Sequence, residues 1–227
     1  MSEFGDTSLD LVNSALDAGV QHIVLLMRHS AREFEPGIHD LLNPLTGEGR
    51  ELSSRFGELL PKNLLLRGYA SPAERCLDTA NLILDGHQAK GGQVTRVRPV
   101  EALGVFYVLD QMRMFKGMQD AGGQVAQLES WFREEIGTDI MMPADLAARL
   151  MVEFAAAKLD RPLATPQLDV LVSHDMTLFT VRDRILRQSA ADFPVDFLDG
   201  LIFFAQQGQY FLQSHHGEPL QITRSPA

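Results

Sequence analysis

Residues 22–32, His-Ile-Val-Leu-Leu-Met-Arg-His-Ser-Ala-Arg, pass directly from an apolar run into charged and polar side chains. A compact apolar run of this length is typical of a strand that is buried on both faces. Arg28 and His29 follow the run immediately, and Arg32 comes three residues later. We therefore expect a buried strand, followed by a polar loop over 30–44, with two arginines and a histidine at its carboxyl end.

Two further apolar runs also end in polar motifs. Residues 64–70 predict a second strand, which is followed by Ser-Pro-Ala-Glu-Arg-Cys over 71–76. Residues 168–172 predict another buried strand, which is followed by Ser-His-Asp over 173–175. A helix is expected to begin in the first of these motifs and to run to about residue 84. Its predicted start has Ser as the N-cap, Pro at the first helical position and Glu as the capping-box acid.

The remaining elements complete an alternation of strands and helices. Helical spacing predicts helices over 7–18, 47–60, 124–136, 144–159 and 175–186. Shorter apolar runs predict a strand over 94–100 and a closing hairpin of 201–205 and 209–212. This order indicates an α/β fold with a mostly parallel central sheet. Because such sheets bind ligands beyond the carboxyl ends of their strands, we expect the three polar motifs to meet at one edge.

Length and charge restrict the kind of protein. A chain of 227 residues is long enough to bury a core and is expected to form a single domain. Twenty Lys and Arg against thirty Asp and Glu give a net charge of −10, which argues against nucleic acid as the main ligand. No apolar run approaches the ~20 residues of a membrane helix. The acidic N-terminal segment differs from a signal peptide, so we expect a cytoplasmic protein that does not bind membranes.

The residue types in the three motifs favour phosphate chemistry. The guanidinium groups of Arg28, Arg32 and Arg75 match the geometry of phosphate oxygens. A histidine among such groups can attack phosphorus and form a phosphohistidine. A second histidine can donate to a phosphate oxygen, and a carboxyl group can give a proton to the departing alcohol. This scheme needs no metal and no cofactor, and the single cysteine, Cys76, excludes a cysteine-built metal site.

The same motifs resemble the three signatures of the histidine phosphatase superfamily, which includes phosphoglycerate mutases that need no metal and histidine acid phosphatases. The segment Leu-Thr-Gly-Glu-Gly over 45–49 also resembles the helix start that follows the first signature. The resemblance spans residues 23–204, and the three motifs together are specific. It implies a three-layer α/β sandwich with a mostly parallel central sheet between helices. The pair His174-Asp175 resembles the acid phosphatase branch, because the mutase branch usually has His-Gly there.

The resemblance implies a role for each site residue. His29 is the expected nucleophile and Asp175 the expected proton donor. The phosphate pocket is expected to consist of Arg28, Arg32, Arg75 and His174. Glu101, just after the predicted strand over 94–100, is an alternative proton donor, because its place resembles that of a glutamate in the mutase-like branch.

Two positions depart from the usual first signature, Arg-His-Gly-x-Arg-x-Pro. Ser30 stands where the superfamily has glycine, and Phe34 stands where it has proline. If the glycine position requires a positive φ, a serine there is expected to be mildly strained.

The segment 102–160 is too long for a plain connection, and the resemblance implies a helical cap over the substrate side. Its methionines and aromatics have two equally weighted interpretations: an adaptable, partly apolar substrate pocket, or the packing between cap and sheet. We expect a metal-independent phosphomonoesterase that acts on a small phosphorylated metabolite. The alternatives are a phosphomutase and an inactive module that binds phosphate esters. The oligomeric state stays open.

Overall fold

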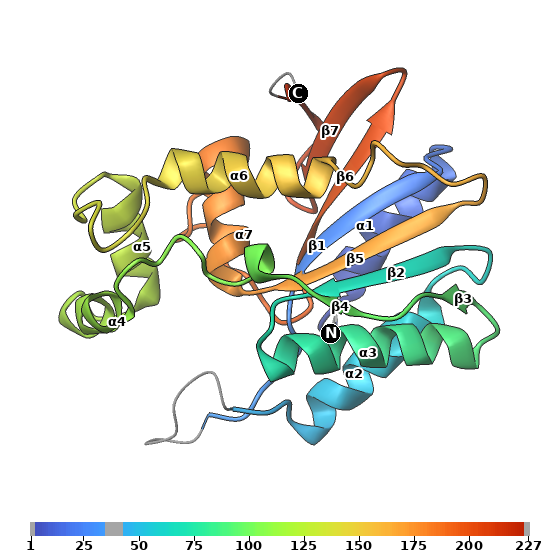
Figure 1. Ribbon diagram of the computed structural model, residues 1–227, viewed down its shortest axis with the longest axis horizontal. Helices are drawn as coiled ribbons and strands as arrows, with labels where there is room; N and C mark the ends of the chain where they lie inside the picture. Colours follow the sequence, from blue (N-terminus) through green and yellow to red (C-terminus); the bar gives the residue numbers. More distant parts are fainter. Residues whose placement is uncertain (1–2, 35–42, 225–227) are drawn as a thin grey trace.

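The computed structural model describes residues 3–34 and 43–224 (Figure 1). Eight strands in this part of the chain form one sheet, in the order β3-β2-β5-β1-β6-β7-β8, with β4 also paired to β2. The strands are β1 (His22–Arg28), β2 (Leu65–Ala70), β3 (Gln93–Val94), β4 (Arg98–Pro99), β5 (Gln167–Ser173), β6 (Gly200–Gln206), β7 (Gln209–Ser214) and β8 (Leu220–Ile222). Strands β1 to β5 run parallel, whereas β6, β7 and β8 are antiparallel.

Helices cover both faces of this sheet and confirm the expected three-layer α/β architecture (Figure 1). One face carries α1 (Asp6–Asp17), α2 (Gly47–Leu59) and α3 (Glu74–Ala89). The other face carries α6 (Ala144–Ala156) and α7 (Asp175–Val181), and α7 continues into a π-helical turn, η3 (Arg182–Leu186). Helices α4 (Gln111–Asp120) and α5 (Gln124–Phe132) lie beyond the end of the sheet at which β5 leads into α7.

The alternation of side chains along β1 explains the two layers of core. Ile23, Leu25 and Met27 are fully buried against α1, α2 and α3. Val24 and Leu26 point to the opposite face and are equally buried in the cluster that includes α6 and α7. Because successive residues of a strand face opposite sides, a strand between two helical layers must be apolar throughout. The unbroken apolar run at the start of the first motif therefore specifies a central strand.

The register of the parallel strands brings the three motifs together. Arg28 of β1 pairs with Ser173 of β5, and Ala70 of β2 pairs with Val172 of β5. The carboxyl ends of β1, β2 and β5 are therefore level, and the residues that follow them share one edge of the sheet. The expected meeting of the motifs at this edge is confirmed.

Several element boundaries differ from the predicted ones. The strand expected over 94–100 is replaced by two separate two-residue strands, β3 and β4. Leu66 pairs with Val94 and Tyr69 with Arg98, so three residues on this side stand opposite two residues of β2. One extra residue of this kind interrupts a continuous ladder. The helix expected over 124–136 ends at Phe132, and Glu134 has a positive φ of 62°. The polar loop expected over 30–44 falls partly on residues 35–42, which lie outside the described residues.

The expected capping of α3 is wrong. The helix begins at Glu74, so Pro72 precedes it, and the N-cap residue is Ala73 without a side-chain cap. The Ser71 hydroxyl accepts a weak hydrogen bond from the Ala73 amide at 3.4 Å and contacts Nε2 of His174 at 3.0 Å. Ser71 is therefore used in a contact between motifs instead of a capping box.

The segment 102–160 contains one helix that the periodicity did not indicate. Helix α4 is capped by Asp110, whose carboxylate accepts from the Arg113 amide at 3.0 Å. An aspartate at this position is a typical N-cap, so it was the signal in the sequence that could have revealed the helix.

The apolar residues of the segment 102–160 divide between the two interpretations. Tyr107, Trp131 and Met141 are buried in the core, whereas several side chains of α4 line a cavity. The description of the segment as a cap within a single domain stays a prediction. None of the helices in the described residues is both long and apolar enough to span a membrane.

Candidate active site

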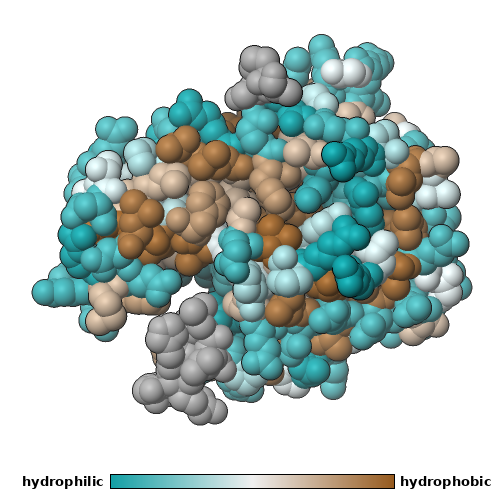
Figure 2. Space-filling model, viewed as in Figure 1, coloured by the Kyte–Doolittle hydropathy of each residue, from teal (hydrophilic) through white to brown (hydrophobic). Residues whose placement is uncertain are grey.

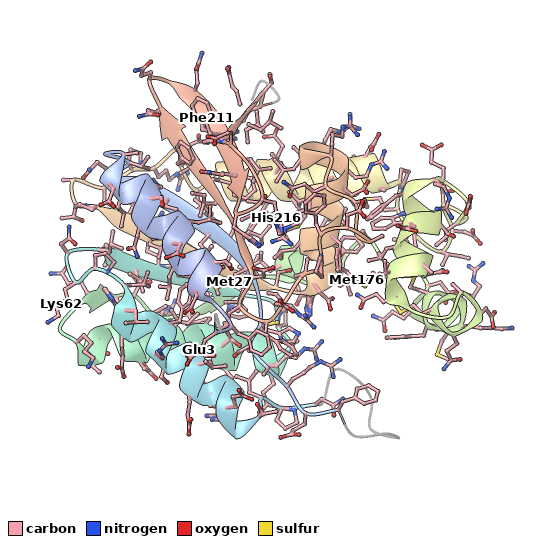
Figure 3. All side chains as sticks on the ribbon, turned by 180° about the vertical axis from the view of Figure 1, so that it is seen from behind. Glu3, Met27, Lys62, Met176, Phe211 and His216 are labelled. Carbon is pink, nitrogen blue, oxygen red and sulfur yellow. The ribbon has the colours of Figure 1, made fainter. Side chains whose placement is uncertain are left out.

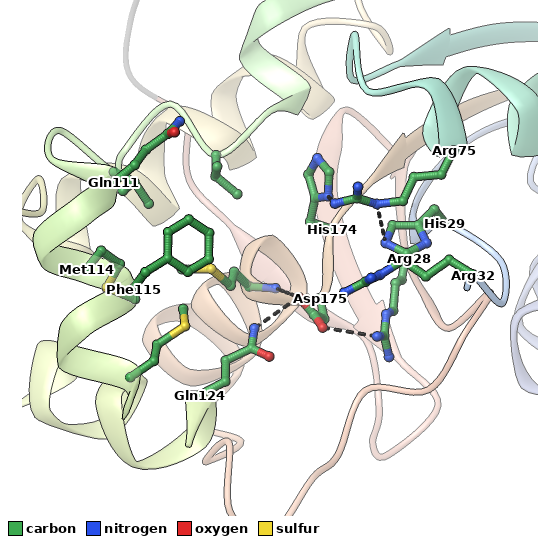
Figure 4. Close-up of a pocket in the computed structure, with 14 residues that line it drawn as sticks. Arg28, His29, Arg32, Arg75, Gln111, Met114, Phe115, Gln124, His174 and Asp175 are labelled. Atoms are coloured by element: carbon green, nitrogen blue, oxygen red, sulfur yellow. Dashed lines mark hydrogen bonds and ion pairs between the residues drawn. The ribbon is translucent and has the colours of Figure 1, made fainter. Parts of the chain in front are cut away.

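A cavity of about 210 Å³ lies at the edge of the sheet where the three motifs meet (Figure 4). The predicted residues Arg28, His29, Arg32, Arg75, His174 and Asp175 all line it. The remaining lining residues come from the segment before α4, from α4 and α5, and from the start of α7: Val105, Val108, Gln111, Met114, Phe115, Met118, Gln124 and Met176. Motifs that are separated by up to about 145 residues in the sequence therefore form one site.

His29 is held in a single tautomer by the backbone. Its Nδ1 donates to the Ser30 carbonyl oxygen at 2.8 Å, so Nε2 carries the lone pair. The residue as a whole is only 3% exposed. Burial, followed by the charge of Arg75 and the neighbouring His174, holds the pKa of His29 well below 6.5. Because protonation occurs only below that lowered pKa, the ring is neutral at pH 7 and its Nε2 lone pair is free of a proton.

Arg75 connects the two histidines. Its Nε donates to Nε2 of His29 at 3.1 Å, and Nη2 lies 3.4 Å from Nδ1 of His174 (Figure 4). The arginine is buried in the first turn of α3, and the two rings have centroids 5.7 Å apart. With Nδ1 of His174 accepting from Arg75, its Nε2 donates to the Ser71 hydroxyl at 3.0 Å. The guanidinium therefore lies between the two rings, with its positive charge at the cavity floor.

Arg28 is oriented by a segment far away in the sequence. Its Nη1 donates to the Val195 carbonyl oxygen at 2.7 Å, and its guanidinium carbon lies 4.2 Å from the centroid of the Phe197 ring. Burial lowers the pKa of Arg28, and the Asp175 carboxylate opposes that shift. Arg32 is less enclosed: its Nη1 donates to the Glu33 carbonyl oxygen at 3.2 Å, at the outer side of the cavity.

Asp175 accepts hydrogen bonds from three directions. Its Oδ2 lies 3.1 Å from Nη2 of Arg28, and its Oδ1 accepts from Nε2 of Gln124 at 3.0 Å. The same Oδ1 accepts from the Met176 amide at 2.7 Å. Gln124 was not found by sequence reasoning, because it lies 51 residues from Asp175 and belongs to no motif. Its amide fixes the orientation of the carboxylate toward the cavity.

Glu101 occupies a different place. It begins the short 3-10 helix η2 (Glu101–Leu103), its side chain is exposed, and it is not among the residues that line the cavity. The structure therefore brings together all the predicted site residues except the alternative proton donor.

The match to known families agrees with this geometry. Residues 24–196 match the family model described as histidine phosphatase superfamily (branch 1). The chain belongs to the histidine phosphatase superfamily. The match is to branch 1, so it does not support the affinity to the acid phosphatase branch that His174-Asp175 had indicated. Among curated proteins, no sequence is significantly similar to this superfamily member.

Solved structures of two phosphatases and of a phosphoglycerate mutase share its fold. Phosphoserine phosphatase from Entamoeba histolytica, solved with phosphoserine, has a TM-score of 0.53 at 16% identity, over 85% of this chain and 95% of the other. Phosphoglycerate mutase from Bacillus anthracis has a TM-score of 0.51 at 17% identity, over 87% and 94%. Mycobacterial glucosyl-3-phosphoglycerate phosphatase, solved with inorganic phosphate, has a TM-score of 0.53 at 17% identity, over 86% and 99%. At these identities the likeness concerns the fold alone.

The serine in the first signature of this histidine phosphatase superfamily member is not strained. The non-glycine residues with positive φ in the described part of the chain are Glu134, Arg187, Leu198 and Gln207, so Ser30 is not among them. Its amide donates to the Thr79 hydroxyl at 3.1 Å, which ties the first motif to α3. The expected strain is therefore absent.

A glycine is required instead where α2 packs on the first motif. A Cβ at Gly49 would lie 2.1 Å from the Ala31 carbonyl oxygen, which accepts from the Thr46 amide at 3.0 Å. We expect Gly49→Ala to lower the free energy of unfolding by about 1–3 kcal/mol, because backbone atoms must move apart. Gly47→Ala in the same turn is the matched control, since nothing lies within 4 Å of its Cβ. Chemical denaturation measures both, and equal stability of the two variants would contradict the argument.

Proposed function

We propose that this chain is a phosphomonoesterase that hydrolyses small phosphate esters through a phosphohistidine on His29. The observation that carries the proposal is the state of this residue: a buried, neutral imidazole whose Nδ1 proton is held by the Ser30 carbonyl, leaving the Nε2 lone pair among three arginines. A nucleophile next to fixed cations is what attack on a phosphate ester requires.

The reaction proceeds in two displacements. Nε2 of His29 attacks phosphorus in line with the ester oxygen, the P–O bond to the alcohol breaks, and Asp175 gives its proton to the departing oxygen. Water then attacks the phosphohistidine, the Asp175 carboxylate takes a proton from it, and the P–N bond breaks. The products are the alcohol and inorganic phosphate, and both side chains return to their starting states.

The cations bind the transferring group and stabilise its charge. Arg75 bonds both histidines in this structure, and a bound phosphoryl group would take over these donors and leave Nε2 of His29 free to attack. Arg28 and Arg32 face the same cavity, and His174 lines it as well, where a ring N–H can donate to one of the phosphate oxygens. Three guanidinium groups supply the positive charge for the transition state, so the scheme includes no metal.

Phosphate release from 4-nitrophenyl phosphate, measured with and without a chelator, tests this function. We expect turnover that the chelator leaves unchanged and a transient pool of protein-bound phosphate that is labile in acid and stable in base. A phosphomutase would return the phosphoryl group to the alcohol and release little phosphate. An inactive binding module would bind the ester and neither release phosphate nor become labelled.

The proton donor can be identified from its dependence on the leaving group. Asp175→Asn should slow hydrolysis of an alkyl phosphate about 100-fold or more, but slow 4-nitrophenyl phosphate far less, because an aryl oxygen leaves with little help from a proton. Asp175 lines the cavity with its Oδ2 3.1 Å from Nη2 of Arg28, so its carboxyl group is next to the place where an ester would bind among the arginines.

Glu101→Gln is the matched test of the alternative donor. We expect this variant to hydrolyse the alkyl phosphate and 4-nitrophenyl phosphate at the wild-type rates, since Glu101 does not line the cavity. If Glu101→Gln shows the selective loss on alkyl phosphates and Asp175→Asn does not, the acid is Glu101, as the mutase-like resemblance implies.

A further inference from the structure

The cavity has two ends of opposite chemical character. The end at the sheet carries the charged and ionisable groups, whereas α4 and the residues next to it supply the other wall (Figure 4). That wall consists mainly of Val105, Val108, Met114, Phe115, Met118 and Met176. Figure 3 places Met176 on the side of α7 that faces α4 and α5. A ligand whose phosphate sits among the arginines therefore has its other end in apolar surroundings.

Among the described residues that line the cavity, all the positively charged side chains lie at the end next to the sheet, where the phosphate would bind. Arg28, Arg32 and Arg75 come from the first two motifs, and the far wall adds only the neutral amides of Gln111 and Gln124. One of these amides already donates to Asp175. Residues 35–42, outside the described part, contain no lysine or arginine. A second anionic group on a substrate, such as a carboxylate, would lose its hydration in this cavity without gaining a cation.

Part of the apolar wall is exposed to solvent, and exposed apolar surface is unfavourable in water unless a ligand covers it. Phe115 lines the cavity and is 45% exposed, whereas Met114 beside it is buried, with its sulfur in contact with Nε2 of Gln127 at 3.8 Å. Figure 2 shows apolar residues over the part of the molecule where α5 and α6 lie. Methionines adapt to ligands of different shape, and an exposed aromatic at the mouth of a cavity offers a surface for an apolar group.

We infer that the substrate is a phosphate monoester of a neutral, largely apolar alcohol, whose hydrocarbon part binds against Val105, Val108, Phe115 and Met118. The inference rests on the proposed function and specifies its substrate class. Phosphoserine and phosphoglyceric acid carry a second charged group, and such compounds are expected to be poor substrates. Phe115 is the residue that determines the preference, because its ring forms the open side of the apolar wall.

A matched series of esters tests the substrate class through kcat/KM. Ethyl, butyl and hexyl phosphate have similar leaving groups, and 5-carboxypentyl phosphate replaces the terminal methyl of the hexyl chain by a carboxylate. We expect kcat/KM to rise about fourfold per buried methylene, the equivalent of about 0.8 kcal/mol. Hexyl phosphate should exceed 5-carboxypentyl phosphate by at least about tenfold, because the carboxylate must be desolvated.

Variants of α4 connect this preference to the cavity wall. Phe115→Ala should make kcat/KM depend less on the length of the alkyl chain. Phe115→Lys should reduce or reverse the ratio of kcat/KM for hexyl phosphate to that for 5-carboxypentyl phosphate. Met112→Lys is the matched control: Met112 lies on the same helix, is 80% exposed and does not line the cavity. It should leave the preference unchanged, and both sites are exposed enough for the variants to fold.

Binding of hexylphosphonate and 5-carboxypentylphosphonate, measured by calorimetry, separates the substrate class from the reaction. Hexylphosphonate should bind more tightly. If the esters are hydrolysed without preference, or the carboxylated compounds are preferred, the inference is overturned and the proposed function stands. If hexylphosphonate binds as expected and no ester is hydrolysed, the proposed function is overturned and the ligand class is retained. Failure of both phosphonates to bind overturns the inference whatever the turnover.

Discussion

Replacing His29 by asparagine should abolish phosphate release, with kcat reduced by at least about a thousandfold, because the phosphoryl group then has no nucleophile to accept it. Asparagine is small enough for the buried site and its amide can still donate to the Ser30 carbonyl, which the His29 ring contacts at 2.8 Å. The acid-labile, base-stable phosphate that is trapped on the wild-type protein should disappear. Quench-flow with a radiolabelled ester measures turnover and trapping together.

His216→Asn is the control for this experiment. His216 is exposed and lies outside the cavity lining, so the variant should keep wild-type turnover and trapping. Circular dichroism establishes that both variants fold. Retention of more than about a tenth of the wild-type kcat by His29→Asn, or trapping that persists in it, would show that another residue accepts the phosphoryl group.

Arg75→Lys should lower kcat/KM by about 100- to 1,000-fold, although the charge is conserved. The guanidinium contacts both rings, through Nε to His29 at 3.1 Å and Nη2 to His174 at 3.4 Å, and a single ammonium cannot replace a planar fork. The loss should appear in kcat as well as in KM, because the charge that Arg75 faces grows in the transition state. The inhibition constant of vanadate should rise in parallel.

Arg50→Lys is the matched arginine control. Arg50 pairs with Asp78 at 2.7 Å on the exposed surface between α2 and α3, away from the cavity lining, so kcat/KM should stay within about twofold of wild type. An Arg75→Lys variant as active as Arg50→Lys would mean that charge alone, without fork geometry, serves the site. Denaturation curves of both variants separate loss of stability from loss of transition-state binding.

Much of the candidate site was predictable because its residues follow strands directly. A buried strand is recognised from an apolar run, and the residue after it is then placed at the carboxyl end. His29, Arg75 and His174 each belong to such a motif, and the parallel register levels the ends of β1, β2 and β5. These inferences need only local pattern and the known geometry of parallel sheets, so they are available without any tertiary contact.

The contacts that orient those residues were not predictable in the same way. Val195 and Phe197 hold Arg28 from more than 160 residues away, and Gln124 holds Asp175 from outside any motif. Ser71 resembled a helix cap by its neighbours, yet its hydroxyl contacts His174, 103 residues later. Local propensity weighs only neighbouring residues, whereas each of these bonds depends on which surfaces meet after the chain has folded.

Features that depend on neighbouring residues are therefore determined by the sequence alone, whereas features that depend on contacts between distant segments are decided by the tertiary structure. The identity of the ionisable groups, their place at the carboxyl ends of the strands and the α/β architecture follow from apolar runs and the polar residues next to them. The order β2-β5-β1 of the strands that carry them follows only from the folded sheet. The exact partners of Arg28 and Asp175, and the placement of α4 as an apolar wall opposite the arginines, follow from packing between distant segments. An amphipathic helix specifies that an apolar face must be covered, but which surface covers it is decided only when the layers assemble around a common core.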